Sequence, residues 1–186
     1  ALTMAMERTC GTLKLADFDL VELSNLNRIR TGLHNLEVSK VLIAAREIAE
    51  IDPFIQVEIF EEGLTDDNMN AFFDGTQKLD LLVEVCDSLD VKLKCRIEAR
   101  KRRIPVVMET NDRCMLDIER FDMEPERAIL HGLVNDEEIA AVGQLDGRQR
   151  MELVLKIVDG QNLSASMKSS FAEVGKTLRS WPQLAS

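Results

Sequence analysis

The sequence predicts an α/β protein with a doubly wound, mostly parallel, Rossmann-like sheet, helices on both faces and a helical C-terminal extension. Short apolar stretches of strand length alternate with longer stretches of helical periodicity, which is typical of parallel sheets. The stretch KLDLLVEVCD (residues 78–87) is almost continuously apolar, as expected for a strand that is buried on both faces. The chain has 186 residues, of which 45% are hydrophobic, so it is large enough for an ordinary hydrophobic core.

The predicted elements alternate along the chain, beginning with a helix. That helix ends at Gly11, because glycine commonly stops helices. The second helix ends at Asp52-Pro53, since a proline disfavours helical conformation at the residue before it. Thr65 or Asp66 is expected to cap the third helix. The predicted helices cover residues 1–9, 35–53, 65–73 and 88–103, and the predicted strands cover residues 12–17, 55–60, 78–87 and 104–110.

Beyond about residue 120 the strand pattern gives way to helical patterns. Helices are predicted at residues 136–145, 147–160 and 164–181. In the last of these, Met167, Phe171, Val174 and Leu178 fall on one face, which indicates packing against a core, with a partner-binding helix as the other interpretation. No N-cap residue precedes the first helix of the chain and no stop signal follows the last. We therefore expect the chain to be a piece of a longer protein, cut at both ends.

The composition excludes several classes of function. The net charge is −10 at pH 7, so binding to nucleic acid is not expected. No apolar stretch is long enough to span a membrane and no signal peptide pattern is present, so a membrane partner is not expected either. The 4 cysteines are scattered and form no CxxC pair, which indicates reduced thiols in a cytoplasmic protein. The basic run KLKCRIEARKRR (residues 92–103) has no interleaved aromatic residues and is interpreted as a solvated helix face.

A polar cluster follows the first predicted strand, in the stretch LADFDLVELSNLNR (residues 15–28). Asp17 and Asp19 stand at the carboxyl end of that strand, where doubly wound sheets bind their ligands. A carboxylate after the second strand of such a sheet commonly binds the hydroxyl pair of a ribose. Asp17 is therefore a candidate for ribose binding, and we expect Asp19 to support the loop.

This stretch resembles the signature of the ThiF/MoeB/HesA superfamily, whose members are ATP-dependent activators of ubiquitin-like and sulphur-carrier proteins. The family pattern is an apolar strand, Asp-x-Asp, Val, a short link and Ser-Asn-Leu-x-Arg, and every element is present between Asp17 and Arg28. The pattern continues with a Lys that opens the next helix, matched by Lys40. It then has a buried strand that ends in Asp, matched by Asp87. The resemblance covers roughly residues 1–110.

The resemblance implies a role for each matched residue. Asp17 would hold the ribose of ATP, while Asn25, Arg28 and Lys40 would contact its phosphates. Asp87 would lie at the α-phosphate, bind Mg²⁺ and take part in catalysis with Arg28. The implied reaction is adenylylation of the C-terminal carboxylate of a small carrier protein, with ATP and Mg²⁺ as cofactors, in a homodimer. Guanidinium, ammonium and Mg²⁺ suit this chemistry, because negative charge builds on phosphate oxygens during attack on the α-phosphorus.

Each of these side chains also has a structural interpretation. Asn25 could hold a turn, and Arg28 could form an ion pair. Lys40 could be one of the lysines that are common at helix starts. Asp87 could cap the helix that follows it.

The resemblance also implies a division of the chain. Residues 1–118 would form a ThiF-like nucleotide-binding α/β domain whose first strand and glycine-rich loop are missing. Residues 119–186 would form the helical extension, leading into a further domain. The pattern ETNDRCMLDIERFD (residues 109–122) is similar to a divergent branch in which a ThiF-like domain is joined to a nitroreductase-like flavin domain. FMN is therefore expected in such a partner domain.

Departures from the family pattern leave two other functions open. Ile29 stands where the family has Gln, and Ser88 stands where it has Asn. Both departures favour a degenerate nucleotide fold that serves as a scaffold or dimerisation module for a fused enzyme. An NAD(P)-dependent oxidoreductase also fits Asp17, although the block Ser24–Arg28 has no role in it. Cys114 is a candidate nucleophile, with an ordinary loop thiol as the other interpretation.

Overall fold

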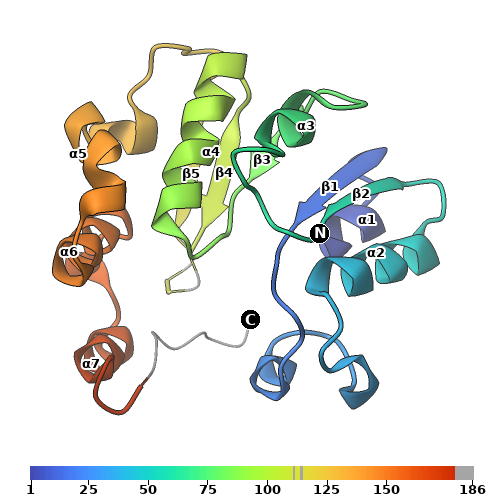
Figure 1. Cartoon of the computed structure of the whole chain (residues 1–186), viewed down its shortest axis with the longest axis horizontal. Coiled ribbons are helices and arrows are strands. Elements are labelled where there is room, and N and C mark those ends of the chain that lie inside the picture. The colour runs from blue at the N-terminus through green and yellow to red at the C-terminus, as the bar shows by residue number, and fades with distance from the viewer. Residues whose placement is uncertain (111, 114, 179–186) are drawn as a thin grey trace. The chain divides into compact units, whose positions relative to one another are not determined.

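The computed structural model describes residues 1–178 except Asn111 and Cys114, so the candidate nucleophile lies outside the described residues. The described residues form two compact units, of which the first ends at Gln77 and the second begins at Lys78. Each unit contains a pair of parallel strands with helices alongside (Figure 1). The predicted α/β class with mostly parallel, Rossmann-like strands is confirmed.

The first unit alternates helices and strands in the predicted order. Strands β1 and β2 run parallel, with Thr12 opposite Gln56. Short 3-10 helices, η1 and η2, occupy the loop between β1 and α2. The elements are α1 (Leu2–Met6), β1 (Thr12–Ala16), η1 (Leu23–Asn27), η2 (Leu33–Asn35), α2 (Lys40–Ile51), β2 (Gln56–Phe60) and α3 (Met69–Asp74).

The core of the first unit lies between its strands and helices. A buried cluster joins Ala5 of α1, Leu13 of β1 and Ile48 of α2 with Ile55. Helix α3 contributes Phe72, whose ring packs edge-on against Phe60 with centroids 5.3 Å apart. This edge-to-face geometry is the favoured arrangement for aromatic pairs. The core thus holds the strand pair in place, together with the loop that follows β1.

Helix α2 begins later than predicted, at Lys40 instead of residue 35. The preceding residues pair with the chain just after β1 instead. The N–H of Val21 donates to the carbonyl of Val38, and the N–H of Glu37 donates to the carbonyl of Val21, both at 2.9 Å. Helical periodicity alone does not reveal such a backbone pairing, because it depends on a segment far away in the sequence. The predicted stop before Pro53 is confirmed, since α2 ends at Ile51.

The second unit contains β3, β4 and β5, and helices follow them. Strand β4 runs parallel to β3 and antiparallel to β5. Helix α4 lies along one face of these strands (Figure 1). Beyond Glu119 helices follow, as predicted, but the helix predicted over residues 164–181 ends at Glu173. Val174 and Leu178 therefore lie outside it and form a backbone bridge with each other. The elements are β3 (Leu82–Val83), α4 (Leu89–Arg102), β4 (Val106–Glu109), β5 (Leu116–Glu119), η3 (Ile129–Gly132), α5 (Asp136–Ala141), η4 (Val142–Gln144), α6 (Gly147–Ile157), η5 (Gly160–Asn162) and α7 (Ala165–Glu173).

The prediction that residues 78–87 form a strand buried on both faces was wrong. Strand β3 has the bounds Leu82–Val83, and burial alternates along its neighbourhood. Leu82 and Glu84 are each 4% exposed, whereas Val83 is 45% exposed and Val85 is 66% exposed. Helix α4 covers the face that carries Leu82 and Glu84, so burial within this unit is one-sided. Strand β5 was not predicted at all.

None of the helices within the described residues combines the length and the apolar composition that crossing a bilayer requires.

Candidate functional site

The chain turns away from the sheet directly after β1, at Asp17. The N–H of Asp17 still donates to the carbonyl of Phe60, at 3.3 Å, and so continues the pairing with β2. The Asp17 carboxylate accepts the N–H of Asp19 at 2.9 Å. This contact is a local side-chain turn of the kind that Asp readily forms. The half-buried carboxylate therefore lies at the carboxyl end of β1, as predicted.

Asp19 joins this strand end to the start of α2. Its carboxylate oxygen Oδ2 lies 2.6 Å from Nζ of Lys40. Its carbonyl also accepts the backbone N–H of Lys40, at 3.0 Å. The Lys40 side chain is 19% exposed and that of Asp19 is 49% exposed. The structure thus links Asp17, Asp19 and Lys40, and Asp19 pairs with the ammonium to which the family resemblance gives a phosphate.

Asn25 fixes the turn at the start of η1. Its side-chain oxygen accepts the N–H of Glu22 at 3.0 Å. The Glu22 carboxylate in turn accepts the N–H of Asn25, which completes a capping box. Asn25 is only 6% exposed. The turn-holding interpretation of Asn25 is therefore confirmed, and the sequence reasoning had given no role to Glu22.

Arg28 lies at the end of η1 and is half-buried. Its Nη1 donates to the carbonyl of Ser24 at 3.2 Å and to the side-chain oxygen of Asn27 at 3.1 Å. Both acceptors are neutral, so these contacts orient the guanidinium without neutralising its charge. A guanidinium held in this way suits a planar, bidentate contact with a phosphate.

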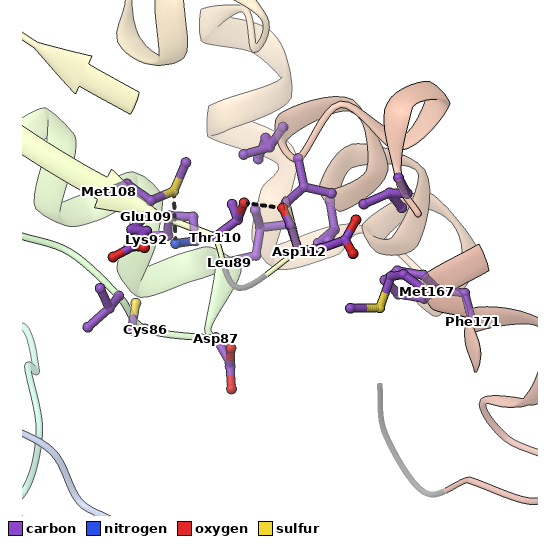
Figure 2. Close-up of a pocket in the computed structure, with 15 residues that line it drawn as sticks. Cys86, Asp87, Leu89, Lys92, Met108, Glu109, Thr110, Asp112, Met167 and Phe171 are labelled. Atoms are coloured by element: carbon purple, nitrogen blue, oxygen red, sulfur yellow. Dashed lines mark hydrogen bonds between the residues drawn. The ribbon is translucent and has the colours of Figure 1, made fainter. Parts of the chain in front are cut away.

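Asp87 belongs to the second unit, where it is exposed between β3 and α4. The cap of α4 is its neighbour Ser88, whose hydroxyl accepts the N–H of Val91 at 3.4 Å. The helix-capping interpretation therefore applies to Ser88, which is the N-cap of α4. Asp87 lines a pocket of about 220 Å³. Its carboxylate points away from Lys92 and Met108, which lie deeper in the same pocket (Figure 2).

The pocket is mainly apolar, with acidic side chains among its lining residues. Asp112 accepts the hydroxyl of Ser164 at 2.7 Å and the N–H of Ser164 at 2.9 Å. These hydrogen bonds hold the pKa of Asp112 below its usual value. Glu109 and Asp87 are the other acidic lining residues. The apolar lining includes Leu89, Met108, Val154, Ile157, Met167 and Phe171.

A buried group of charges lies beside this pocket, and sequence reasoning missed it. Glu84 is 4% exposed and contacts both Lys92 and Arg96 of α4. Burial alone would raise the pKa of Glu84, but the two cations outweigh burial and hold that pKa below its usual value. The pKa of the nearby Cys86 thiol is raised by burial and by Glu84, so this thiol is a poor nucleophile at neutral pH. The sequence feature that could have indicated this buried charge group is the single Glu within the apolar stretch LLVEVC.

Comparison with known families decides the identity of this fold. The model of the ThiF family matches residues 1–145. The chain belongs to the ThiF family. This ThiF chain is related to ubiquitin-like modifier-activating enzymes, with 31% identity over 104 residues to ubiquitin-like modifier-activating enzyme 5 of Xenopus laevis, covering 50% of the chain.

A more similar relative is the uncharacterized protein MT1398 of Mycobacterium tuberculosis. It is 46% identical to this ThiF chain over 185 residues, which is 100% of the chain. The chain spans 26% of the length of this relative and 26% of the length of the Xenopus enzyme. The matched region is therefore about a quarter of each of these proteins.

Solved structures share the fold of this ThiF chain. The crystal structure of PaaA covers 65% of the chain at 25% identity, with a TM-score of 0.55 and 37% of its own length matched. E. coli tRNA N6-threonylcarbamoyladenosine dehydratase, TcdA, in complex with AMP covers 61% at 24% identity, with a TM-score of 0.52 and 48% of its own length matched. The biosynthetic enzyme MccB in complex with N-formylated MccA covers 62% at 18% identity, with a TM-score of 0.51 and 34% of its own length matched.

Proposed function

We propose that this chain belongs to an ATP-dependent adenylyltransferase that activates the C-terminal carboxylate of a small carrier protein or peptide. The observation that carries the proposal is the loop between β1 and α2. Asp17 lies at its start, Arg28 lies within it and Lys40 lies at its end, and Asp19 joins the two ends through hydrogen bonds and an ion pair. The names of the relatives support it, since they include ubiquitin-like modifier-activating enzymes. Among the fold neighbours, TcdA was solved in complex with AMP and MccB in complex with N-formylated MccA.

The proposed reaction requires groups that stabilise the negative charge that builds on the phosphate oxygens. An oxygen of the substrate carboxylate attacks the α-phosphorus of ATP. The bond from that phosphorus to the β-phosphate oxygen breaks, and pyrophosphate leaves with the electron pair. Arg28 would bind phosphate oxygens as a planar fork, and Lys40 would act as a point charge. Asp17 would accept hydrogen bonds from the ribose hydroxyls, and Asn25 would keep the loop in place.

The donor set at Asp87 fits Mg²⁺. A single exposed carboxylate beside a pocket is sufficient, because Mg²⁺ is commonly held by one or two carboxylates together with substrate phosphates and waters. Asp87 would hold the ion, which would supply positive charge to the phosphates when bound.

A second candidate is a degenerate nucleotide fold that acts as a scaffold. The ion pair between Lys40 and Asp19, at 2.6 Å, favours it, because a phosphate must displace a carboxylate to reach this ammonium. Ile29 and Ser88 favour it as well, as departures from the family pattern. The scaffold predicts that the full-length protein does not bind ATP.

Calorimetry of the full-length protein with Mg²⁺ and either ATP or adenosine tests the proposal. Arg28→Ala is expected to weaken ATP binding roughly 10- to 100-fold, the loss of a charge-assisted contact, and to leave adenosine binding unchanged. Asp17→Ala is expected to weaken both ligands. Arg30→Ala is the matched control, because Arg30 is an exposed arginine of the same loop.

The opposite outcome is clear-cut. If the wild-type protein gives no heat with ATP, or if Arg28→Ala and Arg30→Ala behave alike, the adenylylation proposal fails.

The proposal also takes the protein to be a cytoplasmic homodimer. The resemblance supports the dimer, and the free thiols of Cys10, Cys86 and Cys95 support the compartment.

A further inference from the structure

Glu84, the residue that follows β3, is the centre of a buried charge network. Lys92 and Arg96 lie one turn apart on α4, and both donate to its carboxylate. Nζ of Lys92 lies 2.9 Å from Oε1 and 2.7 Å from Oε2 of Glu84. Arg96, which is fully buried, donates to Oε2 of Glu84. Both carboxylate oxygens are therefore held by cations of one helix.

The network continues from Arg96 to strand β5 of the same sheet. Nε of Arg96 donates to Oε2 of Glu119 on β5 at 2.8 Å. The other oxygen of Glu119 accepts the backbone N–H of Leu130 in η3 at 2.5 Å. Glu119 is fully buried, like Arg96. The end of β3, helix α4, strand β5 and η3 are thus connected through charged side chains.

Glu84, unlike Glu119, also contacts the backbone next to Asp87. Oε1 of Glu84 accepts the backbone N–H of Cys86 at 2.8 Å. On the other side of Asp87, Ser88 is fixed as the cap of α4. Figure 2 shows Cys86 and Asp87 on this turn, with the Asp87 carboxylate pointing away from the side chains deeper in the pocket. The backbone that carries Asp87 is thus fixed on both sides.

Stability alone does not account for this arrangement. Apolar residues of similar volume often replace buried ion pairs without loss of stability, because burying charges is costly. Apolar side chains in place of Glu84, Lys92 and Arg96 together could fill the same space. They could not accept the N–H of Cys86, which the Glu84 carboxylate does while the cations of α4 hold it.

We propose that Glu84 is a positioning residue, which fixes the turn at Cys86 so that the Asp87 carboxylate meets Mg²⁺ and the phosphates. Arg96 donates to Glu84 and is itself held by Glu119. The inference rests on the proposed nucleotide role of Asp87. Residues that orient a metal ligand commonly matter for metal affinity almost as much as the ligand itself.

Two Glu-to-Asp substitutions test the proposal in the full-length protein, because each keeps a carboxylate and shortens the side chain. Glu84→Asp keeps the charge but withdraws the carboxylate from the N–H of Cys86. Glu119→Asp perturbs the same Arg96 without touching the turn. Amide hydrogen exchange, followed by mass spectrometry on peptides spanning residues 84–88, is expected to accelerate about tenfold in Glu84→Asp and not in Glu119→Asp. Equal exchange in the two variants overturns the proposal.

If Glu84→Asp folds poorly, Glu84→Gln tests whether the turn depends on the acceptor oxygen of residue 84 or on its negative charge. Its amide oxygen can still accept the N–H of Cys86, although its charge is lost. Glu84→Gln is therefore expected to melt at a lower temperature and to retain slow exchange at residues 84–88. Fast exchange in this variant, without a matching increase elsewhere in the second unit, overturns the proposal.

The Mg²⁺ dependence of ATP binding connects the turn to function. The Mg²⁺ concentration for half-maximal ATP binding is expected to rise about tenfold in Glu84→Asp and to stay unchanged in Glu119→Asp. If Asp87→Asn alters this concentration and Glu84→Asp does not, the positioning role is overturned while the proposed function stands. If Asp87→Asn has no effect, the proposed role of Asp87 itself fails and the positioning role fails with it.

Discussion

At the scale of single residues, Lys14 of β1 is unusual because it is a buried lysine. Its side chain is 2% exposed. Nζ donates to the carbonyls of Phe72 at 3.0 Å and Gln77 at 2.7 Å, and it lies 3.4 Å from the carbonyl of Ala71. The last carbonyls of a helix have no partner within that helix, and a cation suits the negative end of the helix dipole. Lys14 thereby closes the end of α3 against the strand pair.

Lys14→Met is expected to destabilise the protein by roughly 2–3 kcal/mol, because it removes a charged donor from these carbonyls and from Glu58, whose Oε2 lies 3.6 Å from Nζ. Urea denaturation measures the loss. The control is Lys78→Met, since Lys78 is exposed and donates to the carbonyl of Arg102 at 3.1 Å. Its expected effect is within about 0.5 kcal/mol. Equal shifts in the two variants would mean that the contacts of Lys14 contribute nothing.

The Glu84 carboxylate gives a second prediction at this scale. Its pKa in the folded state is held below the usual value, because Lys92 and Arg96 outweigh the effect of burial. A lowered pKa means that the contribution of Glu84 to stability is present above its unfolded pKa of about 4.3 and is lost as the pH falls through the folded value. Glu84→Gln should therefore flatten the acid limb of a plot of melting temperature against pH.

The control for this pH profile is Glu62→Gln, because Glu62 is an exposed residue of the first unit. Its profile is expected to follow that of the wild type. An acid limb in Glu84→Gln as steep as that of the wild type would show that Glu84 does not contribute to acid sensitivity.

At the scale of elements, Arg150 connects α6 to α4. Its Nη1 donates to Oδ2 of Asp90 at 2.7 Å, and its Nη2 donates to the carbonyl of Val142 at 3.0 Å. The hydrogen bond from Arg150 also holds the pKa of Asp90 below its usual value. A guanidinium has enough donors, in a fixed geometry, to serve both partners at once, whereas an ammonium is a point charge.

Arg150→Lys is therefore expected to loosen the attachment of η4 and α6 to α4. Faster hydrogen exchange across residues 142–157 would report it. Arg148→Lys is the control, because its pair with Glu152 is solvated, with side chains 87% and 62% exposed. Unchanged exchange in Arg150→Lys would show that apolar packing alone holds these helices together.

The order of the elements could be predicted, because periodicity is a local property. Strand β5 could not, since four residues of the sequence LDIE carry too little pattern to stand out. For the candidate site, the sequence correctly placed Asp17 at the end of β1 and Lys40 at the start of α2. The pairing of Lys40 with Asp19 spans 21 residues and depends on the fold. Glu84 escaped notice because a single charge in an apolar stretch resembles ordinary strand alternation.

At the scale of the whole molecule, each unit contains a strand that is paired along one edge. Among the described residues, β1 has β2 as its hydrogen-bonded neighbour, and β3 has β4. Val83 of β3 and Val85, just after it, are 45% and 66% exposed. A strand edge with apolar neighbours readily pairs with another strand. These features, with relatives about four times the length of the chain, suit a region that works within a larger protein.

If Lys40 meets a phosphate as proposed, its pair with Asp19 would also affect which anions bind there. An unpaired ammonium on an open loop would attract any small anion, including inorganic phosphate and sulfate. Here a carboxylate already lies 2.6 Å from the ammonium, on a chain with a net charge of −10. A small anion that displaced Asp19 would replace one contact with another and gain little. In the proposed site, a ligand with many further contacts would offset that loss, and the pair would then disfavour small inorganic anions relative to ATP.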